Sequence, residues 1–467
     1  MINFIRERHF PLADSRKLNW MWFKDHAANS SMVNFNNKYY MYFRGIFNQG
    51  ASSLGVWTSQ VQNANGYSFD RTPVTNPIIT AGSSGQFDST GIYDPVAVVF
   101  NGKVHIYYMG TGLGDSRIGL ATSVDGVTFT KQGTVLASGI TPPGGTPAVV
   151  VDNSNTLHIF YTKGSPETGW AYYHRSSTDG INFGSETLAL AASGVPGSFD
   201  EKSIITARVF YEAPYYYFVY GGSPVFDDYP EGFGIARSTD LLNWTRYPGN
   251  PVIIRGACGT WDEAAIWSAD IVNINGDHYM YYEGVGTGTT AGGATSNNAR
   301  DVKYGGYDVT AFSQLFVAKM TKPSSLSGWN DSNISGLYRI RNASSGRYLS
   351  TDAQSRIILS DSGSANIFNI SRSSNGFYNI INTTDATRFQ PEGLSRGRGA
   401  AIKSSVSTGV TSQDWYFSCV DNNFFVITNR YSGMVFTSDN GSSSKSSRVA
   451  LQPHASVPHQ IWELVKV

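Results

Sequence analysis

The run Ala269-Asp-Ile-Val-Asn-Ile-Asn-Gly-Asp-His-Tyr-Met-Tyr-Tyr282 decides the fold, because its pattern occurs five times in the chain. Aliphatic and β-branched residues precede a short polar turn, and aromatic residues follow it. This pattern predicts two antiparallel strands joined by a tight turn. The other four copies cover residues 31–43, 95–108, 147–161 and 207–220.

A second repeat adds further strands to these pairs. The segments 119–129, 173–183 and 234–244 each carry an Asp that opens a tight turn between a third strand and a fourth. Looser third strands stand at 54–57 and 315–318, after the first and the last pair. Four strands in each of five units predict a five-bladed β-propeller, which we place at residues 1–322.

The remainder of the chain carries a repeat of its own. A polar linker at 323–335 is followed by three motifs 47 residues apart, which are Asn366-Ile-Phe368, Gln413-Asp-Trp415 and Gln460-Ile-Trp462. Three such repeats resemble a ricin-B-type β-trefoil of the kind found in carbohydrate-binding family 13, where a Gln-x-Trp motif closes each third. We therefore expect an all-β protein, with the propeller followed by a β-trefoil at residues 336–467.

Composition excludes several classes of protein. The 35 Lys and Arg balance the 35 Asp and Glu, so the basic excess of a nucleic-acid-binding protein is missing. Charged residues make up 15% of the chain, against about 25% in a typical globular protein, while aromatic residues reach 13%. Disordered chains lack aromatics, and no apolar run approaches the roughly 18 residues of a membrane span. We expect a soluble, folded protein that binds neither nucleic acid nor membranes.

The few cysteines and the chain start bound the remaining expectations. Cys258 and Cys419 fall in different predicted domains, which argues against a disulfide framework or a zinc site. We expect no metal, no cofactor and a monomeric state. The segment after Met1 lacks the basic and then apolar pattern of a signal peptide. We expect a cytoplasmic protein, or a secreted or cell-surface bacterial enzyme if a leader has been removed.

The starts of the innermost propeller strands converge on one funnel, so residues there are the candidates for a shared site. An aromatic-Asp pair recurs before three of these strands, which favours a structural role for Asp88, Asp200 and Asp262. Positions that differ between blades are better candidates. Asp94 stands where other blades have Thr206 and Ser268, and further carboxylates occur at Asp25, Glu201 and Glu263.

Buried carboxylates are costly unless they are paired or hydrogen-bonded. Glycoside hydrolysis needs two of them, one protonated and one ionised, and a third often tunes the acid. We predict Asp94 or Asp25 as base or nucleophile, and Glu201 or Glu263 as general acid. The structural alternative, that all four are turn residues or surface acids, stays open.

Other residues near the strand starts are candidates for holding a sugar. Aromatic rings there would stack on sugar rings, unless they only fill the propeller core, and basic residues would bind hydroxyl groups. The predicted substrate-binding residues are Trp22, His26, Tyr93, Lys202, Arg208, Trp267, Asp270 and Arg300. In the trefoil, Asp352 and Asp439 follow an aromatic residue and are the predicted sugar-binding residues.

Five blades, Asp94-Pro95 at an inner strand and Gly102-Lys-x-x-x-Tyr-Tyr108 after it resemble the superfamily of glycoside hydrolase families 43 and 32. The resemblance covers residues 20–320. It implies an Asp as base or nucleophile, a second Asp that orients and a Glu as acid. The family's Glu-Gly-Pro acid motif is absent, although Glu212-Ala-Pro214 is similar to it.

We therefore expect hydrolysis of glycosidic bonds in a poly- or oligosaccharide. The resemblance suggests furanosides such as arabinofuranosyl or fructofuranosyl units, or xylosyl and galactosyl ones. Two alternatives remain. One is a sugar-binding protein without catalysis, motivated by the missing acid motif, and the other is a transglycosylase or glycoside phosphorylase on the same propeller.

Overall fold

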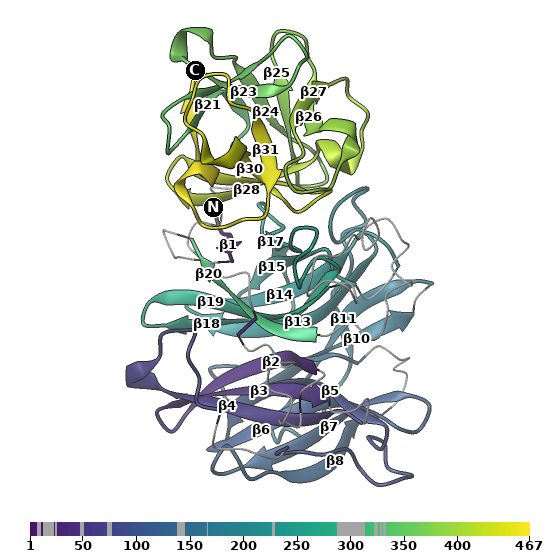
Figure 1. Ribbon diagram of the computed structural model, residues 1–467. Helices are drawn as coiled ribbons and strands as arrows, with labels where there is room; N and C mark the ends of the chain where they lie inside the picture. The colour runs from purple at the N-terminus through teal and green to yellow at the C-terminus, as the bar shows by residue number, and fades with distance from the viewer. Residues whose placement is uncertain are drawn as a thin grey trace.

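The computed structural model describes residues 1–6, 11–12, 23, 26–46, 51–71, 77–137, 145–165, 167–226, 229–286, 313–321, 326, 329 and 333–467. Within these ranges the regular structure is β-strand, apart from short 3-10 turns (Figure 1). No helix among them is long and apolar enough to cross a membrane. The 3-10 turns are η2 (Val61–Asn63), η5 (Ser362–Ser364), η6 (Glu392–Leu394), η7 (Thr411–Gln413), η8 (Asp439–Gly441) and η9 (Pro458–Gln460).

Five separate antiparallel sheets form the blades, so the predicted five-bladed propeller is confirmed. Each starts with an inner strand and continues outward. Blade one holds β2 (His26–Phe35), β3 (Lys38–Ile46) and β4 (Ser53–Gln60), and blade two holds β5 (Gly91–Phe100), β6 (Lys103–Thr111), β7 (Ser116–Ser123) and β8 (Thr130–Leu136).

The other three blades follow the same order from the axis outward. Blade three holds β9 (Pro147–Val151), β10 (Leu157–Ser165), β11 (Gly169–Ser177) and β12 (Thr187–Leu190). Blade four holds β13 (Ser203–Glu212), β14 (Tyr215–Ser223), β15 (Gly232–Ser238), β16 (Thr245–Arg246) and β17 (Ile253–Ile254), and blade five holds β18 (Ala265–Ile274), β19 (Asp277–Val285) and β20 (Ser313–Met320).

The outer edges differ from the prediction of four strands in every unit. Blade five is completed by β1 (Phe4–Ile5), which pairs antiparallel with β20 and so closes the propeller with the start of the chain. Blade one has three strands among the described residues. A strand of two residues is too short to show an alternating apolar pattern, which is why the sequence repeat did not predict β1.

Four inner strands share a β-bulge close to the axis. The pairing register shifts around one residue in each strand, and that residue has a positive φ, which is unusual for a residue other than glycine. The four residues are Asn29 (φ 46), Asp94 (φ 46), Thr206 (φ 53) and Ser268 (φ 55). The bulges therefore place one polar residue per blade at the same level of the propeller.

The recurring aromatic-Asp pairs have the structural role that their repetition predicts. In each of three blades the buried Asp accepts hydrogen bonds from a Tyr of the second strand and from a cation farther along the chain or at its start. These pairings satisfy a carboxylate that burial would otherwise penalise. The trios are Asp88–Tyr108–Lys131, Asp200–Tyr220–Arg246 and Asp262–Tyr282–Arg6.

The C-terminal domain is built from three units of four strands, which lie together in one sheet system. The strands are β21 (Gly336–Asn342), β22 (Tyr348–Thr351), β23 (Ile357–Ser360), β24 (Phe368–Arg372), β25 (Tyr378–Asn382), β26 (Arg388–Pro391), β27 (Ile402–Ser405), β28 (Trp415–Asp421), β29 (Phe424–Asn429), β30 (Val435–Ser438), β31 (Val449–Gln452) and β32 (Trp462–Lys466). Figure 1 shows these green to yellow strands on one side of the propeller, next to β1 and β17. The trefoil and its limits stay predictions.

The repeated Gln-x-Trp motif of this domain contacts both a loop and the hydrophobic core. Nε2 of Gln413 donates to Val406 O at 2.7 Å, and Nε2 of Gln460 donates to Pro453 O at 2.9 Å. The partner Trp415 is fully buried and donates its indole N–H to Phe389 O at 3.0 Å. The Gln of the motif therefore satisfies a backbone carbonyl of a loop, and the Trp two residues later packs in the core and satisfies a buried carbonyl of a strand.

The Asp200 trio yields the first prediction. Tyr220→Phe removes a buried hydroxyl that donates to Asp200 at 3.0 Å. We expect the free energy of unfolding to fall by about 1–3 kcal/mol, the cost of leaving a buried charged acceptor short of one donor. Urea unfolding measures it. The matched control is Tyr211→Phe, because Tyr211 is 41% exposed and should change stability by less than about 0.5 kcal/mol. Equal effects in both variants would refute the structural role of the trio.

Candidate functional site

Two carboxylates meet at the propeller axis, on blades two and five. Asp94 occupies the bulge of β5, and Glu283 lies on β19. Asn29 Nδ2 donates to Glu283 Oε2 at 2.7 Å and to Ser268 Oγ at 3.0 Å, and Ser268 Oγ donates to Asp94 Oδ1 at 3.4 Å. Three blades are thus joined by one hydrogen-bonded chain. We call Asn29, Asp94, Ser268 and Glu283 the axial cluster.

Both carboxylates of the axial cluster are largely removed from water, with Asp94 7% and Glu283 3% exposed. Burial raises the pKa of Asp94, while the charges of Arg44 and Arg208 work against that rise. Burial also raises the pKa of Glu283; Arg44 again opposes the rise and the charge of Asp94 adds to it. An ionised Asp94 therefore favours the protonated form of Glu283.

Arg44 is the cation next to this pair. One of its terminal nitrogens lies 3.7 Å from Glu283 Oε1, and its guanidinium carbon lies 5.2 Å from the ring centre of Tyr93. Arg44 acts on both carboxyls and Arg208 acts on Asp94, so these charges favour a state in which Asp94 is ionised and Glu283 carries a proton. That is the protonation state that acid–base catalysis by a carboxyl pair requires.

Arg208 and Asp270, both predicted to bind substrate, lie two residues beyond the bulges of their own strands. Nη2 of Arg208 donates to Ser30 O at 3.1 Å and to Pro95 O at 3.0 Å, and so ties blade four to blades one and two. Asp270 accepts from Met32 N at 2.7 Å, and burial raises the pKa of its carboxyl to about 6. These contacts hold the blades together, and a role in substrate binding stays a prediction.

Glu201 and Glu263 each accept a hydrogen bond from the backbone of a preceding turn. Glu201 accepts from Gly197 N at 2.6 Å, and Glu263 accepts from Gly259 N at 2.7 Å. Each carboxylate thereby closes a turn that begins four residues earlier. An ion pair with Lys202 at 2.7 Å holds the pKa of Glu201 below its ordinary value, which is unfavourable for a general acid. The two carboxylates therefore cap equivalent turns, and their role as general acid stays a prediction.

The remaining predicted residues divide into three groups. Tyr93 and Trp267 are neighbours of bulge residues in the chain and are half-buried, so they flank the axial cluster. His26 accepts a hydrogen bond from Ser313 N at 3.2 Å through Nδ1, and Lys202 is engaged by Glu201. Trp22, Asp25 and Arg300 lie outside the described residues, so their roles stay predictions.

The prediction missed Glu283 although its sequence context is regular. The residue follows Tyr281-Tyr282 at the end of the fifth strand pair, where the pattern indicates an ordinary strand end. The other second strands carry Arg44, Met109, Thr162 and Gly221 near this level. A comparison of strand ends, as well as strand starts, would have singled out this acid.

Several buried polar atoms around the axis lack a protein partner among the described residues. They are Asn29 Oδ1, Ser30 Oγ and Thr206 Oγ1. Buried polar atoms are normally satisfied by protein, ordered water or ligand, so these three atoms are available to water or to a polar ligand. Within the described ranges, no three His, Cys, Asp or Glu side chains are grouped as ligands for a metal ion.

In the C-terminal domain, the two predicted sugar-binding carboxylates are engaged by their own turns. Asp352 accepts from Gln354 N and Arg356 N, both at 2.9 Å, and pairs with the Arg356 side chain at 3.0 Å. Asp439 pairs with Arg448 at 2.9 Å. A sugar hydroxyl at either position would compete with an arginine, so sugar binding there stays a prediction.

Comparison with known proteins supports the fold. No family model and no curated protein sequence matches the chain. Among solved structures, an N-acetylgalactosamine deacetylase from F. plautii, in complex with blood group B trisaccharide, is 15% identical over 68% of this chain and 95% of its own, with a TM-score of 0.50. This likeness shows a shared propeller fold, and its low identity carries nothing about activity.

Two glycoside hydrolases are similar at lower scores. An exo-β-1,3-galactanase from Clostridium thermocellum is 15% identical, covers 95% of this chain and 96% of its own, and has a TM-score of 0.43. A thermostable family-43 glycoside hydrolase is 13% identical over 63% of this chain and 89% of its own, with a TM-score of 0.47.

The hydrogen-bonded chain of the axial cluster can be tested without a substrate. Asn29→Gly keeps a residue that tolerates the positive φ but removes the donor to Glu283. We expect a loss of about 1–3 kcal/mol of unfolding free energy, since the buried oxygens of Glu283 and Ser268 each lose a donor. The control is Asn37→Gly, at an exposed turn with φ 58, where we expect a change below about 0.5 kcal/mol. If denaturant unfolding gave both variants the same stability, Asn29 would not bridge the blades.

Proposed function

We propose that the protein is a glycoside hydrolase whose carboxyl pair is Asp94 and Glu283. The observation that carries the proposal is the meeting of these two side chains, from different blades, in one buried hydrogen-bonded cluster beside Arg44. A pair of carboxyls of which one is protonated is what cleavage of a glycosidic bond needs. The family resemblance of the propeller points to the same reaction.

Glu283 acts as the general acid in this proposal. Burial raises the pKa of its carboxyl and the charge of Asp94 raises it further, which favours the protonated form that a general acid needs. Burial raises the pKa of Asp94 as well, but there Arg208 opposes the rise together with Arg44, so we assign Asp94 as base or nucleophile. As base, it takes a proton from water while the oxygen of that water bonds to the anomeric carbon. The glycosidic C–O bond breaks, and Glu283 gives its proton to the leaving oxygen.

We propose further that the C-terminal domain is a β-trefoil that binds glycan. Its three units of four strands and its repeated anchor contacts support the trefoil. In each unit the motif residue contacts the same strand position: Asn366 with Ser350, Gln413 with Gln390 and Gln460 with Thr437. Which sugar the enzyme cleaves, a furanoside, a xyloside or a galactoside, is to be determined with a panel of glycosides.

Amide substitutions test the carboxyl pair. Asp94→Asn and Glu283→Gln each leave the side-chain shape but abolish proton transfer, so we expect kcat to fall by about 10²–10⁴-fold on whichever glycoside the wild type cleaves. In the pH–rate profile of the Asp94 variant, the decline of the residual activity on the alkaline side should shift to lower pH. The reason is that removing the charge of Asp94 lowers the pKa of Glu283, which must be protonated to act as the acid. Initial rates from pH 4 to 9, with product analysis, measure both effects.

The control for this experiment is Glu167→Gln, at an exposed turn outside the cluster, which should keep wild-type kcat. Full activity of the Glu283 variant combined with loss in Glu201→Gln or Glu263→Gln would overturn the assignment in favour of those acids. Turnover that needs phosphate would indicate a phosphorylase, and acetate release without cleavage of a glycosidic bond would indicate a deacetylase. Sugar binding without any product would leave a binding protein.

A further inference from the structure

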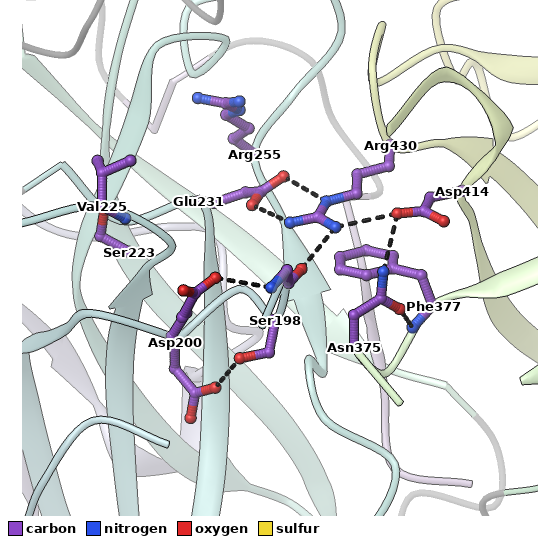
Figure 2. Close-up of polar contacts among 12 residues, drawn as sticks. Ser198, Asp200, Ser223, Val225, Glu231, Arg255, Asn375, Phe377, Asp414 and Arg430 are labelled. Atoms are coloured by element: carbon purple, nitrogen blue, oxygen red, sulfur yellow. Dashed lines mark hydrogen bonds and ion pairs between the residues drawn. The ribbon is translucent and has the colours of Figure 1, made fainter. Parts of the chain in front are cut away.

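Arg430 belongs to the C-terminal domain, but its guanidinium lies against the propeller (Figure 2). The side chain is 3% exposed. Nε and Nη2 donate to the two carboxylate oxygens of Glu231, at 3.0 and 2.9 Å. Nη1 donates to Gly197 O at 2.8 Å and to Asp414 Oδ2 at 3.0 Å, and the Phe377 ring centre lies 4.1 Å from the guanidinium carbon.

These contacts hold two propeller segments from one point. Glu231 directly precedes β15, and Gly197 begins the turn that Glu201 caps ahead of β13. The planar fork of an arginine fixes a carboxylate in distance and in orientation, which a lysine does not do. A buried ion pair adds little to stability compared with a well-packed apolar contact, so its best-attested use is to fix a geometry.

The segment 229–231 connects this ion pair to the axial cluster. Pro230 O accepts from Ile266 N at 3.3 Å, next to the start of the β18 bulge. The Tyr229 ring packs edge-on against Trp267, with ring centres 5.3 Å apart. Trp267 directly precedes Ser268 and is the strand partner of Glu283. A shift of residues 229–231 would therefore displace Trp267, which is next to Ser268 in the chain and opposite Glu283 in the strand pair.

We propose that Arg430 is a positioning residue for the axial cluster: through Glu231 it holds the Tyr229–Trp267 ring pair in place beside Glu283. The C-terminal domain thereby contributes to the propeller site without touching the substrate. The structural part of this inference stands on the contacts alone, and its kinetic part rests on the proposed glycosidase function.

Hydrogen exchange in the full-length protein tests the structural part. Arg430→Met removes the fork, and Arg430→Lys keeps the charge and serves as the second variant if the first does not fold. The matched control is Arg372→Met, because Arg372 also joins the domains, through Asn250 O at 3.1 Å and Pro248 O, without contacting residues 229–231. We expect amide exchange in peptides spanning 229–236 and 264–270 to rise about tenfold or more in the Arg430 variants and to change less than about twofold in the control.

Steady-state kinetics test the second part. We expect Arg430→Met to raise KM about tenfold, with a smaller change in kcat, because a displaced Trp267 weakens substrate placement before it affects proton transfer. Arg430→Lys should recover part of the loss. Exchange or KM effects that are no larger in the Arg430 variants than in Arg372→Met would overturn the proposal and leave domain docking as the only role. A wild type without glycosidase activity would contradict the proposed function, and the exchange result would still decide the positioning role.

Discussion

A single left-handed residue in the inner strand is the constraint on which the centre of the propeller depends. Each of the bulges at Asn29, Asp94, Thr206 and Ser268 costs on the order of 1–3 kcal/mol, and such strain persists only where surrounding contacts fix it. Those contacts are present, because Asn29 bonds Ser268 and Ser268 bonds Asp94 across three blades. These four residues therefore place their strain at the level of the fold where polar side chains meet at the axis.

Burial of charge is the second consequence of that geometry. Once Asp94 and Glu283 are drawn to the axis, loss of hydration raises the pKa of both, while Arg44 opposes the rise at both and Arg208 opposes it at Asp94. Asp200 and Asp262 differ from this pair, since each is bonded to a tyrosine and an arginine. The partners that burial gives these two acids indicate a structural role.

Repetition explains what the sequence could and could not predict. The five strand pairs predict the blades, and the shared Asp88, Asp200 and Asp262 predict a structural role, because each feature recurs at a fixed spacing. Divergence at strand starts selected Asp94, which the structure places in the axial cluster, and it also selected Glu201 and Glu263. Those two share a glycine four residues earlier, which is the signal of a turn cap. Contacts across the axis, such as Asn29 with Glu283, depend on how the blades close and have no local pattern in sequence.

The central claim is that a sugar is cleaved between Asp94 and Glu283. A crystal structure of Asp94→Asn soaked with an oligosaccharide that the wild type cleaves tests it most directly. The account predicts a sugar unit at the propeller axis, with its glycosidic oxygen about 2.6–3.2 Å from the Glu283 carboxyl and a ring against Trp267 or Tyr93. Sugar bound at the C-terminal domain alone, with the axis occupied only by water, would contradict it.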